Sequence, residues 1–456
     1  MSDSLKSISV HDGRYRKHTE VLGDILSEYG LIRHRVYVEV KWLQFLSREL
    51  EIFQNARISE TESIIEGFNP ESARMIKSIE KTTNHDVKSV EYFIKKKLVD
   101  MGMADISEFV HFACTSEDIN NTAYALMIKK ARKLLCDRFL AVHSLLEEKA
   151  EKYADLSMMS RTHGQPASPT TLGKELINFA WRMRKEIKLL EILPEEAKMN
   201  GASGNFNAHY IAFPHINWHE SSRKFISEYL ELTPLSWTTQ INPYHYISHM
   251  LHNIIRLASV VIDIDRDIWG YISLNYFKQK KKENEVGSST MPHKINPINF
   301  ENSEGNMGMA ISIMEHLSTK LLNSRFQRDL TDSTVLRNLG SVFGYLFIST
   351  DNLISGLSRI DADESVIKAD LEAHPELLSE AVQTVMRVFG EKNPYEKMKA
   401  MTRGKKTTMD DIRTFIDNLE SVPEKVKKRL KKMTPSSYTG IASELVKSYR
   451  KEKWNS

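Results

Sequence analysis

Apolar residues recur at helical spacing over long stretches of this chain, and strand-like alternation is weak. In the clearest stretch, from residue 244 to about residue 276, they return every three or four positions. Its apolar positions are Ile247, Leu251, Ile254, Ala258, Val261, Ile264, Ile268 and Ile272. A helix of that length would measure roughly 45–50 Å and needs partner helices along its whole length, from this chain or from other subunits. The pattern predicts an all-α fold with a central bundle of long helices.

Glycine and proline positions divide the chain into three regions. Residues 1–110 show shorter helical patterns joined by loops, and residues 111–360 hold the longest periodic stretches. Residues 361–456 are highly charged, with short helical patterns broken by prolines. We therefore expect an N-terminal helical domain, a central long-helix bundle domain and a C-terminal helical domain. A chain of 456 residues is long enough for two or three domains.

Composition narrows the class of protein. Apolar residues make up 41% and charged residues 27%, as in globular proteins. The net charge of +3 is too small to indicate nucleic-acid binding. Two cysteines, Cys114 and Cys136, give no disulfide framework and suit a reducing compartment. The sequence shows no signal peptide and no apolar run of about 18 residues, so we expect a cytoplasmic location without a membrane partner.

The richest candidate chemistry lies between Gly287 and Pro297. Glycine, two serines and two prolines predict a loop rather than a helix or strand. A dense set of polar groups is costly to bury without partners, so a ligand is one candidate partner. These polar residues, with those just after them, are Ser288, Ser289, Lys294, Asn296, Glu301 and Asn302.

Four earlier segments place polar side chains in turn or cap settings. They contribute Arg14 and Tyr15; Asn84, His85 and Asp86; His111, Thr115 and Ser116; and His163. Thr115 and Ser116 begin a capping pattern, and the exposed N–H groups of a helix start favour an anion. Gly164 and Pro166 predict a loop around His163, with a helix from about Thr170. Ordinary turns, a capped helix and a structural histidine are the alternatives.

Later segments add polar groups of a phosphate-binding kind. Arg328, Ser333 and Arg337 form such a cluster, because guanidinium groups grip two phosphate oxygens at once; a helix with internal ion pairs is the alternative. The Gly- and Asn-rich segment 200–207 predicts a tight loop near the site. His245, His249 and His252 fall on one helix face without a zinc-type pattern, which favours a polar seam over a metal site. Cys114 has no activating neighbours and is expected to pack.

The segment Gly-Ser-Ser-x-Met-Pro-x-Lys-x-Asn-Pro resembles the signature loop of the fumarase/aspartase superfamily, whose members eliminate fumarate from a succinyl group. His293 within it resembles the adenylosuccinate lyase branch. Thr-x-His-Asp-Val-Lys, Thr-Ser-Glu-Asp, Thr-His-Gly-Gln-Pro and Arg-x-Leu-Thr-Asp-Ser-x-x-x-Arg match further blocks in the family's order. The resemblance spans nearly the whole chain. It implies a three-domain, all-α fold and a homotetramer with sites shared between subunits. We expect no cofactor and no metal.

The same resemblance implies cleavage of adenylosuccinate to AMP and fumarate, and of succinylaminoimidazole-carboxamide ribotide in purine synthesis. It assigns the catalytic base to Ser288 and the acid to His163. The implied substrate-binding residues are Arg14, Tyr15, Asn84, His85, Asp86, His111, Thr115, Ser116, Gln240, Ser289, Lys294, Asn296, Glu301, Asn302, Arg328, Ser333 and Arg337. Argininosuccinate lyase is the nearest alternative, although it would lack the cluster from Arg328 to Arg337. A crystallin-like structural role is an alternative from another class.

Overall fold

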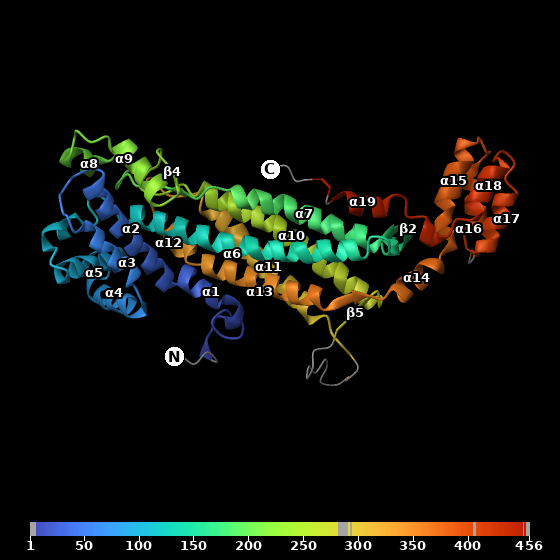
Figure 1. Cartoon of the computed structure of the whole chain (residues 1–456), viewed down its shortest axis with the longest axis horizontal. Coiled ribbons are helices and arrows are strands. Elements are labelled where there is room, and N and C mark those ends of the chain that lie inside the picture. The colour runs from blue at the N-terminus through green and yellow to red at the C-terminus, as the bar shows by residue number, and fades with distance from the viewer. Residues whose placement is uncertain (1–5, 281–290, 292–293, 405–406, 450, 453–456) are drawn as a thin grey trace. The chain divides into compact units, whose positions relative to one another are not determined.

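The computed structural model describes residues 6–280, 291, 294–404, 407–449 and 451–452 (Figure 1). The chain divides into two compact units. Unit 1 comprises Met1–Phe139, Glu186–Val261 and Asn302–Asp351, and unit 2 comprises Leu140–Lys185, Ile262–Glu301 and Asn352–Ser456. The three-domain division remains a prediction.

Long helices dominate the structure, as the apolar periodicity predicts. Five of them run through both units: α6 (Ser116–Lys152), α7 (Leu172–Ile192), α10 (His245–Ser273), α11 (Ile298–Lys320) and α13 (Leu339–Ser358). The stretch expected to be helical from residue 244 to about 276 is α10, so that prediction is confirmed. By length and composition α10 could cross a membrane, yet 61% of its most apolar window is buried within the protein, as in a core helix.

Unit 1 adds shorter helices around a well-packed core. These are α1 (Arg16–Leu26), α2 (Glu28–Arg48), η2 (Ile58–Thr61), α3 (Glu62–Glu66), α4 (Pro70–Thr83), α5 (Asp86–Asp100), η3 (Ala104–Phe109), α8 (Asn207–Ala212), α9 (Trp218–Lys224), η4 (Phe225–Tyr229) and α12 (Thr331–Leu336). The short strands β3 (Glu196–Ala197) and β4 (Thr233–Pro234) pair in parallel. Helix α2 is the centre of this region: Val36, Val40 and Leu43 lie in a buried cluster with Phe93 and Ile94 of α5.

The turn between α4 and α5 shows how local sequence sets a helix boundary. Pro70 occupies the first turn of α4, and the Asn69 side chain accepts a hydrogen bond from the Ser72 N–H group. The helix ends at Asn84, which has φ of 53°, a left-handed conformation that asparagine tolerates well. His85 then caps α5, so two predicted binding residues lie in this turn.

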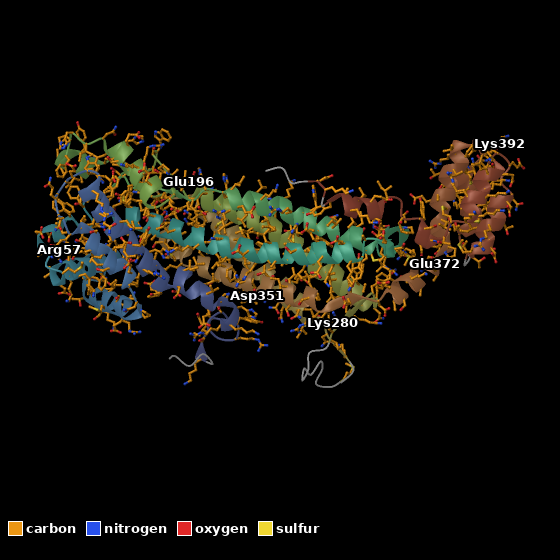
Figure 2. All side chains as sticks on the ribbon, in the orientation of Figure 1. Arg57, Glu196, Lys280, Asp351, Glu372 and Lys392 are labelled. Carbon is orange, nitrogen blue, oxygen red and sulfur yellow. The ribbon has the colours of Figure 1, made fainter. Side chains whose placement is uncertain are left out.

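Unit 2 combines two strand pairs with a group of short C-terminal helices. The strands are β1 (Ser157–Thr162) with β2 (Gln165–Thr171), and β5 (Phe277–Gln279) with β6 (Ile360–Ala362), both antiparallel. The helices are α14 (Glu364–Glu372), η5 (Pro375–Leu378), α15 (Ser379–Val388), α16 (Pro394–Thr402), α17 (Met409–Asp417), α18 (Glu424–Lys431), η6 (Pro435–Ser437) and α19 (Ala442–Tyr449). Leu378, Val382, Met386 and Ile412 lie in their shared apolar core. Charged side chains such as Lys280 lie exposed (Figure 2).

The segment around His163 differs from its prediction. It is a β-hairpin rather than a loop, whereas α7 begins at Leu172, within two residues of the predicted start near Thr170. Thr162 pairs with Gln165, which leaves His163 and Gly164 as the two turn residues with φ of 54° and 72°. Positive φ at both turn positions matches the twist of a hairpin. Pro166 does not prevent pairing, because a two-stranded sheet consists only of edge strands.

Candidate functional site

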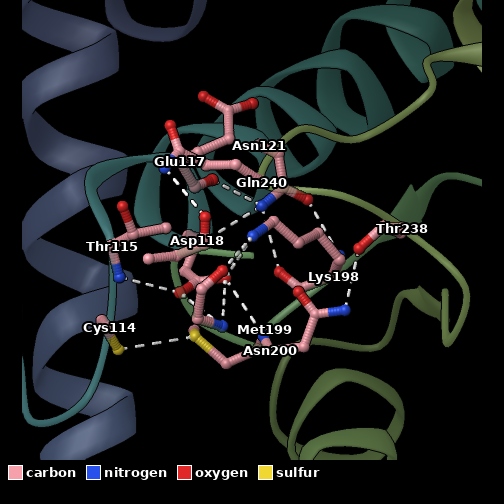
Figure 3. A network of polar contacts seen from close by, with 12 residues as sticks. Cys114, Thr115, Glu117, Asp118, Asn121, Lys198, Met199, Asn200, Thr238 and Gln240 are labelled. Atoms are coloured by element: carbon pink, nitrogen blue, oxygen red, sulfur yellow. Dashed lines mark hydrogen bonds and ion pairs between the residues drawn. The ribbon is translucent and has the colours of Figure 1, made fainter. Parts of the chain in front are cut away.

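A buried network at the start of α6 joins three segments of unit 1 (Figure 3). The segments are the Thr115–Ser116 turn, the Gly-rich loop that follows Lys198, and the stretch from Thr238 to Gln240. Ser116 is the first residue of α6, which confirms the predicted helix start. Both Thr115 and Ser116 are partly buried, so the N-terminal N–H groups of this helix belong to an ordered, half-covered surface.

Asp118 is the acceptor at the centre of this network. Its carboxylate accepts hydrogen bonds from the N–H groups of Thr115 at 2.9 Å, Asn200 at 3.1 Å and Gly201 at 3.1 Å. The Lys198 ammonium lies 2.9 Å from the same carboxylate, and both side chains are fully buried. A buried carboxylate with four such donors is well compensated for the loss of water.

The Gly-rich loop connects this centre to the Gln240 segment. The Asn200 side-chain amide donates to the Thr238 hydroxyl at 2.8 Å, and the Gln240 amide donates to the Ala202 carbonyl at 2.9 Å. Gly201 and Gly204 adopt φ of 83° and 79°, and a Cβ at Gly204 would lie 2.3 Å from the Thr238 carbonyl oxygen. Only glycine fits that approach. The predicted tight loop is therefore confirmed.

Gln240 also meets a predicted phosphate-type residue. Arg328 Nη1 lies 3.3 Å from the Gln240 Oε1 atom, to which it donates, and Arg328 Nη2 lies 3.7 Å from Glu117 Oε2. The Tyr244 hydroxyl donates to Glu117 at 2.5 Å. Burial raises the pKa of Glu117 to about 7, although the Tyr244 hydrogen bond acts in the opposite direction. A carboxyl that changes charge near neutrality thus lies beside two predicted binding residues.

A second cluster in unit 1 contains Asp86 and Arg337. Asp86 accepts from the buried Arg35 guanidinium at 2.7 Å and lies 3.6 Å from Arg337. Arg337 donates to Glu28 at 2.6 Å. Burial alone would raise the pKa of Asp86, but Arg35, together with the Val87 N–H group and Arg337, holds this pKa below its ordinary value. A cavity lined by Glu28, Arg337 and Tyr124 opens beside these groups. Arg337, which the sequence predicts to bind phosphate, therefore has two carboxylate partners within the protein, Glu28 and Asp86.

His111 is held by a neighbouring carboxylate. Its Nδ1 lies 2.6 Å from Glu39 Oε1, and Glu39 is fully buried. Burial lowers the pKa of His111 while Glu39 raises it, and the net effect is upward. Cys114 lies in the same region against Met199, and burial raises its pKa well above the ordinary value. The prediction that Cys114 packs rather than reacts is consistent with this environment.

The remaining predicted residues of unit 1 lie at or near the surface. Arg14 is exposed and its guanidinium carbon lies 5.8 Å from the Tyr15 ring centroid. His85 is exposed and accepts from the Lys88 N–H group at 3.2 Å. Ser333 lies half-buried in α12, and Asn302 accepts from the Asn306 amide through its carbonyl.

His163 lies in unit 2 at the tip of the β1–β2 hairpin. Its side chain is exposed, and in the described part of the chain it makes no hydrogen bond or ion pair. Arg161 of the same hairpin pairs with Asp370 at 2.7 Å, which fixes the strand beneath the turn. A groove next to the turn is lined by Ser160, Arg161 and Thr162. The imidazole is therefore open to solvent within one chain.

The loop predicted to carry the base is only partly described. Ser288 and Ser289 lie outside the described residues. Lys294 is exposed, and its N–H group donates to the Met291 carbonyl at 3.0 Å. Asn296 is half-buried just before α11, and Glu301 in the first turn of α11 accepts from the Trp269 indole at 3.2 Å.

Sequence reasoning missed Lys198, Tyr244 and the site role of Asp118. Asp118 stands three positions after Thr115, a cap spacing that marks it as a local acceptor but not as a partner of a distant lysine. Lys198 carries no sequence signal for burial. His245 and His249 are exposed on α10, and His252 bonds to the Ser248 carbonyl. Among the described residues, no group of three or more His, Cys, Asp or Glu is arranged to hold a metal ion.

Similarity to known proteins covers nearly the whole chain. Residues 13–314 match the family described as Lyase, and residues 324–439 match the one described as Adenylosuccinate lyase C-terminal. A Vibrio cholerae protein named adenylosuccinate lyase is 48% identical over 449 residues, covering 97% of this chain and 98% of that protein. The Escherichia coli protein of the same name is 46% identical over 450 residues, with coverage of 97% and 98%.

Two solved structures share the fold. A fumarate lyase from a Mesorhizobium species superposes with a TM-score of 0.78 at 16% identity, covering 95% of this chain and 98% of that one. A 3-carboxy-cis,cis-muconate lactonizing enzyme from Pseudomonas putida gives a TM-score of 0.75 at 18% identity, covering 94% and 95%. These similarities confirm the predicted all-α, fumarase/aspartase-like fold.

Proposed function

The chain belongs to the adenylosuccinate lyase family, and from this membership we propose that it cleaves adenylosuccinate to AMP and fumarate. The same chemistry applies to succinylaminoimidazole-carboxamide ribotide, because both substrates carry a succinyl group on nitrogen. Both reactions serve purine nucleotide synthesis. No cofactor is part of the proposal, since elimination needs only a base, an acid and groups that stabilise negative charge.

The elimination removes a proton from the carbon beside one succinyl carboxylate and breaks the carbon–nitrogen bond on the next carbon. Negative charge collects in that carboxylate, so donors aimed at it accelerate the reaction. We assign this task to the Thr115–Ser116 start of α6, together with Lys294 and Asn296. The observation that carries the assignment is the buried Asp118 carboxylate, which accepts the Thr115 N–H group and fixes the helix start.

Base and acid are assigned from the family pattern. Ser288 takes the proton from carbon, and His163 donates a proton to the departing nitrogen from the opposite face, which gives anti elimination. An imidazole suits the acid role because its ordinary pKa of about 6.5 lets it exchange protons near neutrality. A serine base requires nearby cations or N–H donors to stabilise its alkoxide, and Lys294 is the candidate cation.

Two groups of residues serve the nucleotide part of the substrate. Arg337 and Ser333 bind the phosphate together with Arg14 and Tyr15, while Arg328 and Gln240 contact the nucleotide nearby. Support comes from the Arg328–Gln240 hydrogen bond and from the cavity beside Arg337. The other assigned substrate contacts are Asn84, His85, Asp86, His111, Ser289, Glu301 and Asn302.

We further propose a cytoplasmic homotetramer whose sites combine residues of several subunits. The exposed imidazole of His163 at a hairpin tip is accessible to another copy of the chain. Leu189 and Ile192 of α7 are 41% and 76% exposed, so this helix offers apolar surface to a partner. Sedimentation of the purified protein tests the oligomeric state, and a stable monomer with full activity would contradict the shared site.

A direct assay tests the proposed reaction. The purified protein is mixed with adenylosuccinate and, separately, with argininosuccinate, and fumarate is measured by its ultraviolet absorbance. We expect fumarate and AMP in equal amounts from adenylosuccinate only. Release from argininosuccinate alone would reassign the substrate, and release from neither would favour a structural role.

A further inference from the structure

We propose that the buried Asp118–Lys198 ion pair is a positioning element of the substrate site. It holds one end of the site, formed by Thr115 and Ser116, at a fixed position relative to the other end, formed by Gln240. The inference rests on the proposed function, because it takes these residues as substrate contacts. Neither member of the pair touches the substrate, since both side chains are fully buried. They act through the backbone of the segments that do.

The first end of the network is the helix start. Asp118 accepts the Thr115 N–H group at 2.9 Å, and its own N–H group donates to the Thr115 carbonyl at 2.9 Å. This reciprocal pair leaves the turn with one conformation. Thr115 and Ser116 are thus held by a carboxylate that three further donors also bind, namely the N–H groups of Asn200 and Gly201 and the Lys198 ammonium.

The second end is the Gly-rich loop. Lys198 Nζ donates to the Gly201 carbonyl at 3.0 Å, and the Gly201 N–H group donates to Asp118. The ion pair therefore binds both backbone polar groups of Gly201. Ala202, the next residue, accepts the Gln240 side-chain amide. Asn200, the residue before Gly201, donates to Thr238. Gln240 therefore takes its position from a loop fixed by the same two charges.

The backbone of Lys198 is fixed independently of its ammonium group. Its N–H group donates to the Asn121 side-chain oxygen at 2.9 Å, and its carbonyl accepts from the Asn121 amide at 3.0 Å. Asn121 lies on α6 one turn after Asp118. The strand end and the helix would thus remain together without the ion pair, so a hydrocarbon chain at position 198 can be accommodated.

A matched pair of double variants tests the proposal. Asp118→Asn with Lys198→Met removes both charges and keeps the approximate volumes, which avoids an unpaired buried charge. Arg132→Met with Glu195→Gln is the control, because the partly buried Arg132 of α6 and the buried Glu195 form another ion pair of unit 1, with atoms 2.6 Å apart. Both double variants lose an ion pair, but only the first loses the link between the two ends of the site.

The inhibition constants of the two products, fumarate and AMP, measure binding at the two ends of the substrate site separately. Fumarate reports on Thr115 and Ser116, and AMP reports on Gln240. In the Asp118/Lys198 variant we expect both inhibition constants to rise about 10- to 100-fold, as small misplacements of positioning groups allow. In the control both constants stay within about twofold of the wild type, the range of a remote change. Unchanged constants in the first variant, or a change in only one of them, would overturn the proposal.

A second, milder variant keeps the test valid if the first does not fold. Asn200→Ala cuts only the side-chain link to Thr238, so we expect the AMP constant to rise and the fumarate constant to stay unchanged. An AMP inhibition constant equal to that of the wild type would overturn the proposal that the Gly-rich loop positions Gln240. Failure of the wild type to form AMP and fumarate would instead overturn the proposed function, so the two failures are distinguishable.

Discussion

The network around Asp118 and the turn that carries His163 are built in opposite ways. Asp118 and Lys198 are fully buried and every segment around them is tied by several hydrogen bonds. His163 is exposed at a two-residue turn and has no hydrogen bond or ion pair in the part of the chain that the structure describes. One region holds its side chains in place before any ligand arrives, whereas the other presents an open imidazole.

This difference suggests a division of labour within the proposed site. Groups that bind a charged substrate gain from being fixed in advance, because no ordering cost is then paid on binding. A group that transfers a proton needs access to the reacting atom, which an exposed imidazole has. Binding and chemistry should therefore respond to separate substitutions.

The largest expected effect is on turnover. His163→Ala should lower kcat about 10²- to 10⁴-fold, the range for loss of a general acid, and Ser288→Ala should also lower it by orders of magnitude. The melting temperature of His163→Ala should hardly change, because the side chain is exposed. Fumarate release checks the rate, with His215→Ala as an exposed-histidine control. Near-normal turnover in either variant would remove that residue from its role.

The second effect is on folding and concerns the buried network alone. Lys198→Met on its own leaves the Asp118 carboxylate buried without its cation, which should destabilise the protein by about 3–5 kcal/mol. Arg57→Met, at an ion pair whose two side chains are about half exposed, should change stability little. Urea denaturation measures both. Equal losses of unfolding free energy in the two variants would show that the Asp118–Lys198 pair contributes no more to stability than an exposed ion pair.

The third effect depends on pH and concerns Glu117. Its pKa is about 7 in the folded protein against an ordinary value of 4.5, so its contribution to stability is complete below about pH 4.5 and declines as the pH rises to 7. Glu117→Gln keeps the acceptor for Tyr244 and removes this loss. We expect the variant to gain up to about 3 kcal/mol over the wild type at pH 8 and little at pH 4.5. Melting curves at both pH values check this, and a net loss at pH 8 would contradict the buried-carboxyl account.

The smallest effect is on binding through the second cluster. Arg337→Ala should raise the KM for adenylosuccinate about 10- to 100-fold with little change in kcat, because hydrogen bonds to a charged group are worth about 1.5–3 kcal/mol. Arg57→Ala is the matched control in the same unit. If KM and kcat both stay at wild-type values, Arg337 does not bind the phosphate.

The sequence predicts those parts of the molecule that depend on local pattern. Spacing of apolar residues identifies α10 almost to its ends, and the cap residues identify Ser116 as a helix start. The hairpin at His163 is missed because proline punctuation alone does not separate a loop from a two-stranded ribbon, whose edges tolerate proline. What identifies it is the positive φ of two adjacent residues, a property of the folded backbone.

Contacts between residues that are distant in the chain cannot be predicted from a single sequence. Lys198 bonds to Asp118, 80 positions earlier, and Arg328 bonds to Gln240, 88 positions earlier. A lysine next to alanine and methionine carries no local sign that it will be buried, because lysines are mostly exposed. The site residues could be named from motifs, but the framework that holds them emerges only when the segments pack.

Titration of adenylosuccinate into the His163→Ala variant by calorimetry tests the division between binding and chemistry most directly. We predict that the variant binds adenylosuccinate with a Kd close to the wild-type KM while releasing fumarate about 10²- to 10⁴-fold more slowly than the wild type. A variant that fails to bind, or that still releases fumarate at the wild-type rate, would contradict it.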